Sequence, residues 1–115
     1  METIKELSAL FLEKGISLKA IGADEYAFSY TNILAVIAEI ERLAIPILGG
    51  DVLIMCHGKF EYTGDSWYYD RQENELISEY VKRSIQHARD YIKNYHERNN
   101  NTLSFFSIVV DIKYA

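Results

Sequence analysis

The residues best suited to covalent chemistry are a neighbouring cysteine and histidine, Cys56 and His57. A thiol nucleophile needs a base within hydrogen-bonding distance. Residues 52–56 contain no polar side chain besides the thiol, which predicts a buried strand, and neighbouring side chains on a strand point to opposite faces. The two side chains therefore cannot hydrogen-bond to each other unless the chain bends. A thiol in so apolar a segment is more typical of a small core residue.

Neither the histidines nor the glycines have the spacing of a metal or phosphate site. No two of the three histidines, His57, His87 and His96, are four residues apart on a helix, and His87 with Asp90 would still need a third ligand. The chain has no G-x-G-x-x-G sequence and no Walker lysine. We therefore expect no metal, no cofactor and no catalytic site, and we interpret the chain as a protein that is not an enzyme.

A Gly-Gly-Asp sequence at residues 49–51 lies within the most apolar strand candidate, residues 47–56. Three residues are too few for a loop that cradles a phosphate. Two adjacent glycines entering a buried strand are typical of a backbone bulge, from which Asp51 would hydrogen-bond to a nearby loop. Contact of Asp51 with a partner is the alternative, and both interpretations stay open.

Charged side chains are distributed unevenly along the chain. Residues 39–80 hold nine acids and three bases, a net charge of −6, in a chain whose formal net charge is −5. Such a segment repels nucleic-acid phosphates and attracts basic surfaces, so we expect a protein partner and no nucleic acid. A plain solvated acidic surface would give the same composition.

Four large aromatic residues fall within this acidic segment: Tyr62, Trp67, Tyr68 and Tyr69. Aromatic side chains beside carboxylates are frequent anchors of protein interfaces. Trp67 is expected in the core, beneath a turn, and strand alternation then places Tyr68 on the more exposed side. The candidate partner-binding residues are Glu61, Asp65, Tyr68 and Asp70.

Hydrophobic periodicity predicts three helices that would position these residues. The first is expected over residues 4–14, the second between Thr31 and Pro46, and the longest over about residues 70–96. The first and the last begin with capping-box spacing, with Thr3 and Asp70 as the caps.

Strands are predicted at residues 25–30, 47–56, 59–63 and 106–114. His57 and Gly58 suit a two-residue hairpin turn, and residues 64–66 suit a second turn. A chain of 115 residues with 49% apolar composition fits one domain, residues 1–115. We predict an α+β fold: a mixed sheet of about four strands packed by three helices, in the order α-β-α-β-β-α-β.

No segment has the composition of a signal peptide or a membrane span. Residues 4–12 are interrupted by polar side chains, and the most apolar region, residues 33–48, contains Glu39, Glu41 and Arg42. The single cysteine cannot form an internal disulfide, which suits a reducing compartment. We therefore expect a cytoplasmic monomer or homodimer with no membrane partner.

Residues 45–52, with the sequence IPILGGDV, followed by Trp67, resemble the immunity protein 40 family of bacterial polymorphic toxin systems. That family is described as an α+β fold marked by a Gly-Gly-Asp motif and a tryptophan, which here are Gly49, Gly50, Asp51 and Trp67. The resemblance covers about residues 25–95. It implies a non-enzymatic antidote that is kept in the cytoplasm and binds a cognate toxin domain. The four motif residues are then expected to be structural.

The main hypothesis is that an acidic, tyrosine-bearing surface docks on a basic face of a toxin and occludes its active site. Two alternatives stay open. A small enzyme would need a pocket near Asp51 and His57 in which titratable groups converge. An oligomeric scaffold or adaptor would need a large exposed apolar patch.

Overall fold

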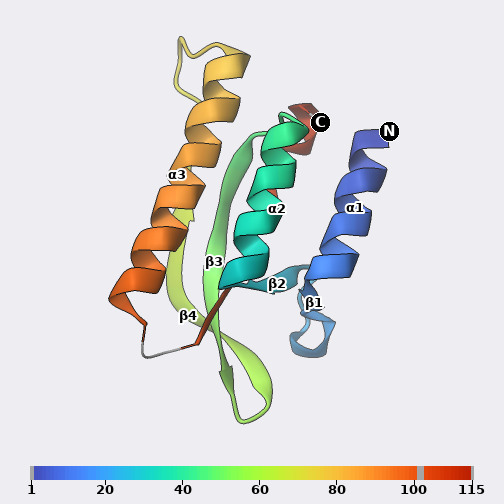
Figure 1. The fold of residues 1–115 in the computed structure, drawn as a ribbon, viewed down its shortest axis with the longest axis vertical. Coiled ribbons are helices and arrows are strands. Elements are labelled where there is room, and N and C mark those ends of the chain that lie inside the picture. Colours follow the sequence, from blue (N-terminus) through green and yellow to red (C-terminus); the bar gives the residue numbers. More distant parts are fainter. Residues whose placement is uncertain (1, 101–102, 115) are drawn as a thin grey trace.

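A computed structural model describes residues 2–100 and 103–114. Three α-helices lie side by side on one face of an antiparallel sheet (Figure 1). The helices are α1 (Glu2–Lys14), α2 (Tyr30–Arg42) and α3 (Ile77–Arg98). The strands are β1 (Ile16–Ser17), β2 (Tyr26–Ser29), β3 (Ile47–Cys56), β4 (Lys59–Tyr68), β5 (Ser104–Phe106) and β6 (Val109–Val110). Short 3₁₀ turns, η1 (Lys19–Ile21) and η2 (Ile112–Tyr114), follow β1 and β6.

The strands are arranged in the order β1-β2-β5-β3-β4, and β6 pairs with β3 beyond the end of β5. The predicted α+β class with three helices is confirmed. The predicted mixed sheet of about four strands is wrong, because six strands form in the described residues and their pairings are all antiparallel. The two-residue strand β1 and the division of the C-terminal strand into β5 and β6 account for the higher number.

The β3–β4 hairpin is the longest part of the sheet. β3 has the predicted bounds and lies between β4 and β5, as its apolar sequence predicted. The predicted turn is also confirmed: His57 and Gly58 have positive φ angles of 51° and 81°, which a two-residue hairpin of this hand requires.

The second predicted turn, at residues 64–66, is wrong, because β4 continues through it to Tyr68. The pairing register instead shifts there: Ser66 lies opposite Asp51 and Tyr62 opposite Leu53, so β4 carries extra residues as a bulge. Gly64, with a φ angle of 92°, lies within the bulge. The turn-forming sequence therefore bends the strand without ending it.

The main hydrophobic core fills the space between the helices and the sheet. The helices contribute Ile33, Val36, Ile37 and Ile40 of α2, Ile85, Ala88, Ile92 and Tyr95 of α3, and Leu7 of α1; the sheet contributes Phe28, Ile47, Val52, Trp67 and Phe106. The helical members of this core recur at the hydrophobic periodicity from which the helices were predicted. Ile77 is an exception: it lies in the first turn of α3 and is 47% exposed.

The opposite face of the sheet, here called the outer face, is only partly covered. The segment between β1 and β2 packs against it and forms a smaller cluster of Leu18, Ala27, Leu53, Phe60 and Phe105. The part of the outer face beside this cluster carries exposed side chains, which are described below.

The helices begin and end at residues other than those that the capping signals in the sequence predict. α1 already includes Thr3, and α2 begins at Tyr30 because the Oγ of Ser29, rather than of Thr31, accepts a hydrogen bond from the amide of Asn32 at 3.3 Å. α2 ends at Arg42, before Pro46, because Ala44 adopts a left-handed conformation with a φ angle of 57°. No helix among the described residues is both long enough and apolar enough to span a membrane.

The start of α3 at Ile77 corrects the prediction of a cap at Asp70. Residues 70–76 form a loop that is anchored by the fully buried carboxylate of Glu75. This carboxylate accepts hydrogen bonds from the hydroxyl of Tyr69 at 2.7 Å and the amide of Gln72 at 3.0 Å, and it pairs with Arg83 at 3.2 Å. Because these contacts hold residues 70–76 in a loop, the helix begins only after them, at Ile77.

A glutamate does cap α3, but it is Glu79, six residues beyond Glu73, the glutamate that capping-box spacing from Asp70 predicts. Glu79 accepts a hydrogen bond from the amide of Leu76 at 2.9 Å, which is the glutamate half of a capping box. Leu76 has no side-chain acceptor to supply the other half. Position 76 therefore lacks the polar side chain by which the start of α3 could have been recognised in the sequence.

The buried Glu75 predicts a pH-dependent stability. Burial alone would raise the pKa of Glu75, but the hydrogen bonds from Tyr69, Gln72 and Arg83 outweigh it and hold the pKa below its ordinary value. A carboxylate with a lowered pKa in the folded state stabilises the fold above its unfolded-state pKa and stops doing so as the pH falls through its folded-state pKa. We expect Glu75→Gln to destabilise the protein at neutral pH, and the difference from wild type to shrink towards about pH 3.

Urea unfolding of wild type and Glu75→Gln, at neutral pH and at about pH 3, measures the difference in their free energy of unfolding. Glu73→Gln is the matched control, because Glu73 is exposed in the same loop. A destabilisation by Glu75→Gln that stays constant over this pH range would contradict the role given to the carboxylate.

Candidate functional site

The Gly-Gly-Asp sequence lies in β3 directly opposite the tryptophan in β4. The antiparallel register pairs Gly49 with Tyr68, Gly50 with Trp67, and Asp51 with Ser66. The four motif residues, Gly49, Gly50, Asp51 and Trp67, therefore form one contiguous cluster across two strands.

Gly50 makes room for the tryptophan on the helix side of the sheet. A Cβ atom at Gly50 would overlap the indole ring of Trp67 and the carbonyl oxygen of Ser107. The indole is 6% exposed and stacks on Tyr91 of α3, with ring centroids 5.0 Å apart. Its Nε1 has no hydrogen-bond partner among the described residues. Trp67 thus joins β4 to the longest helix.

Gly49 is required by the close approach of the β4 backbone. A Cβ atom there would overlap the carbonyl oxygen of Trp67 and lie 2.9 Å from the Cα of Tyr68. Because Gly49 has no side chain, Tyr68 also has no cross-strand neighbour on its own face of the sheet. Tyr68 is accordingly 74% exposed.

The backbone of Asp51 binds the connection between β5 and β6. Its amide donates to the Oγ of Ser107 at 3.1 Å, and its carbonyl accepts from the amide of Ser107 at 2.9 Å. The Asp51 side chain is left on the outer face, where it lines an open hollow of about 300 Å³ together with Ser66, Tyr68 and Val109. The aspartate thus has a structural backbone and a solvent-accessible carboxylate.

The four candidate partner-binding residues do not share one surface. Trp67 points to the helices, so its neighbours Ser66 and Tyr68 point to the outer face, and Asp65 points with Trp67 to the helix side. The Asp65 carboxylate there accepts a hydrogen bond from the Tyr95 hydroxyl at 2.8 Å. Glu61 pairs with Ile54 across the hairpin. Like Asp65, it points to the helix side, opposite to Tyr68, and it is exposed there.

Asp70, the fourth candidate, is exposed in the loop that precedes α3. Among the four, Tyr68 combines the largest apolar surface with high exposure and lines the Asp51 hollow. The assignment of these residues to a partner stays a prediction.

Three tyrosines, including Tyr69 from the acidic segment, use their hydroxyls within the fold. Three tyrosine hydroxyls each donate to a carboxylate: Tyr69 to Glu75, Tyr80 to Asp111, and Tyr95 to Asp65, at 2.7, 2.9 and 2.8 Å. Burial and then these hydrogen bonds raise the pKa of all three hydroxyls. Tyr95 ties α3 to β4, Tyr80 ties α3 to the C-terminal segment, and Tyr69 ties the end of β4 to the loop before α3, so these hydroxyls are already engaged within the fold.

Other residues of the outer face did not enter the candidate set. Tyr62, Met55 and Val109 are 44%, 47% and 43% exposed. Strand alternation was the available signal: Tyr62 is two residues from Phe60, and Val109 lies between Ile108 and Val110, which pack towards the main core. Burial, and then the charges of Glu25 and Asp51, raise the pKa of Tyr62.

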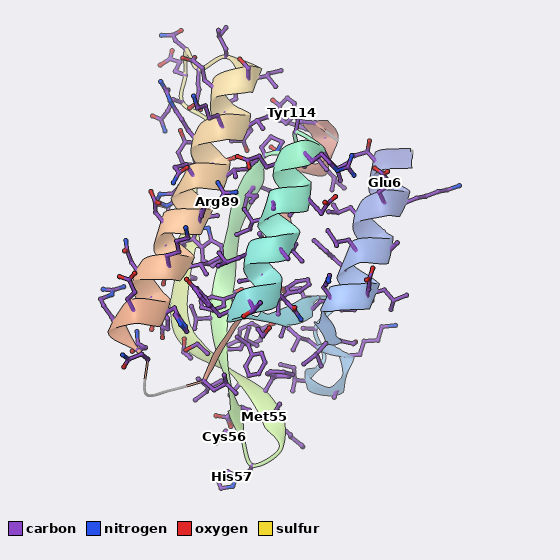
Figure 2. The ribbon with its side chains drawn as sticks, in the orientation of Figure 1. Glu6, Met55, Cys56, His57, Arg89 and Tyr114 are labelled. Atoms are coloured by element: carbon purple, nitrogen blue, oxygen red, sulfur yellow. The ribbon has the colours of Figure 1, made fainter. Side chains whose placement is uncertain are left out.

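Asp51 and His57 lie at different places in the molecule. His57 is in the turn at the free end of the β3–β4 hairpin, with Met55 and Cys56 nearby and beyond the helices (Figure 2). His57 is six positions from Asp51 along the hairpin, a span of about 20 Å. The two side chains do not converge in a pocket, so the enzymatic alternative loses the site that motivated it. Nor do three or more metal-ligating side chains cluster within the described residues.

The contact between Gly50 and Trp67 predicts an unusually costly glycine substitution. Gly50→Ala should destabilise the protein by about 3 kcal/mol or more, because the added methyl group meets both the indole and the Ser107 carbonyl. Gly22→Ala is the control: Gly22 has a φ angle of 82° but open space around it, so about 1–2 kcal/mol of backbone strain is expected. Chemical unfolding of both variants provides the comparison. An equal or smaller cost at Gly50 would show that the indole does not need the glycine.

Comparison with known protein families matches residues 17–110 to the family described as Immunity protein 40. The matched region extends from β1 to β6 and includes the motif cluster and α3. No curated protein sequence matches the chain significantly. The resemblance noted in residues 45–52 and Trp67 is thus confirmed over most of the chain, which belongs to the immunity protein 40 family.

Proposed function

We propose that this chain is a cytoplasmic, non-enzymatic antidote that binds a cognate bacterial toxin domain and neutralises it by covering the toxin's active site. The observation that carries the proposal is the family match over residues 17–110, since the family is one of immunity proteins. A protein of this kind acts by forming a stable complex with its target.

The charge of the chain supports a basic surface on the toxin. The formal net charge is −5, and residues 39–80 alone carry −6. A protein with this charge attracts a basic partner over distances of about a Debye length, which is about 8 Å at physiological salt. Of the candidate contacts Glu61, Asp65, Tyr68 and Asp70, Tyr68 is the best placed to act as an apolar anchor, because it is 74% exposed.

The way in which the polar side chains are used also supports action by contact. The Asp65, Glu75 and Asp111 carboxylates receive hydrogen bonds from tyrosines that hold the fold together. The Asp51 carboxylate, in contrast, faces an open and shallow hollow beside an exposed aromatic ring. An exposed acid beside an exposed tyrosine suits the recognition of a protein surface.

Co-expression tests neutralisation directly. Cells that produce the toxin domain encoded beside this gene should die, and cells that also produce this chain should survive. The control is the same toxin with an unrelated acidic protein of similar size, which should not protect. Cell death in the presence of the folded chain would overturn the proposal.

The electrostatic part of the proposal has its own test. The association rate constant of the purified chain and toxin should fall about tenfold or more as salt rises from low to high concentration, while the dissociation rate changes much less. Stopped-flow or surface-based kinetics measures both rates. An association rate that does not depend on salt would contradict the electrostatic attraction but would not contradict neutralisation of the toxin.

A further inference from the structure

We infer that the toxin docks on the outer face of the sheet, with a long cationic side chain of the toxin occupying the hollow between Asp51, Ser66 and Tyr68. This inference rests on the proposed function and names the surface that performs it. It selects the face opposite the helices, and so it replaces Glu61 and Asp65 as contacts while retaining Tyr68.

Part of the outer face is an apolar and aromatic surface that no other described residue covers. Its exposed side chains come from three strands that the sheet brings together: Met55 of β3, Tyr62, Ser66 and Tyr68 of β4, and Val109 of β6, with Asp51 of β3 between them. The segment containing η1 packs beside them against Leu53 and Phe60 but does not reach the Asp51 hollow, whose lining includes no residue of that segment. Because the strands fix these positions, the surface needs little ordering to bind.

Acidic side chains border this face, and none of them forms an ion pair among the described residues. The Asp51 hollow shares Val109 with a second hollow of about 350 Å³, whose lining includes Asp24 and Glu25 as well as Phe11 of α1. Neither hollow is lined by a lysine or an arginine of the described residues. One carboxylate oxygen of Glu25 is buried with no hydrogen-bond partner among the residues that the structure describes.

The helix layer differs in this respect. The ion pairs found in the described residues all involve the helices or the loop before α3: Arg42 with Glu6 and Glu39, Arg83 with Glu75 and Glu79, and Arg89 with Glu41. Five acids on that side have a cation, although Glu13 and Glu97 do not, and none of Asp24, Glu25 and Asp51 forms an ion pair within the described residues. These three unpaired acids support the outer face as the complement of a basic surface.

The shape of the Asp51 hollow suits an arginine or lysine of the partner. Its lining includes Gly49, Gly50, Val109 and Tyr68. An aliphatic stem can pack on these groups, while the charged end meets the Asp51 carboxylate and the aromatic face of Tyr68. Gly49 leaves the position opposite Tyr68 without a side chain, whereas the missing side chain of Gly50 faces the indole of Trp67.

Binding of the purified toxin domain encoded beside this gene tests the assignment with two pairs of variants. Tyr68→Ala removes the exposed ring, and Leu12→Ala is its control, because Leu12 is 71% exposed on α1. Ser66→Arg fills the hollow with a cation, and Ser78→Arg, on an exposed position of α3, is its control. Circular dichroism and urea unfolding confirm that each variant folds, and calorimetry gives the Kd.

We expect Tyr68→Ala to weaken binding by at least about 30-fold, the effect of truncating a central interface residue, and Ser66→Arg to weaken it at least as much. Both control variants should bind like wild type. If Tyr68→Ala does not fold, Ser66→Arg and the exposed Asp24→Lys still test the face.

Three results would overturn the assignment in distinguishable ways. Wild-type affinity in Ser66→Arg and Tyr68→Ala would exclude the outer face and leave the proposed function intact. Failure of the wild-type chain to bind the toxin would remove the proposed function and this inference with it. A wild-type dimer that Tyr68→Ala converts to a monomer, with toxin affinity unchanged, would show that a second copy of the chain covers the face.

Discussion

The packing of Trp67 over the Gly50 backbone is the contact on which the arrangement of the two layers depends. β4 is an edge strand, paired only with β3, so side chains must hold its last residues against the helices. The indole does this by filling the space that Gly50 leaves and stacking on Tyr91. The same strand then presents Ser66 and Tyr68 on the other side. The buried tryptophan and the exposed tyrosine are therefore two results of one register.

The sequence predicted the elements whose signals are local. Residues 47–56 read as a buried strand and form β3 with the same bounds, and the His57-Gly58 turn follows from the ability of glycine to adopt a positive φ angle. The start of α3 was predicted at Asp70 because the spacing to Glu73 matched a capping box. In the structure Glu79 supplies the glutamate of the capping box, and the loop before the helix is held by Glu75, which Arg83 stabilises from beyond the loop in a way that no local pattern could show.

The candidate site was predictable in kind but not in position. Counting charges along the chain found an acidic segment, yet its acids are distributed over α2, both faces of the β3–β4 hairpin, the loop before α3 and α3 itself. Asp65 was a reasonable contact from its sequence. Its hydrogen bond to Tyr95 links residues 30 positions apart, and only the folded chain reveals that the carboxylate is already engaged.

The position of Trp67 has a practical consequence for spectroscopy. The chain contains a single tryptophan, and its indole is buried on the helix side, with the sheet between it and the outer face. Its intrinsic fluorescence therefore reports whether β4 and α3 remain packed together. The emission of Trp67 monitors the integrity of the core. Binding of a ligand near Tyr68 has to be followed with a label placed on the outer face.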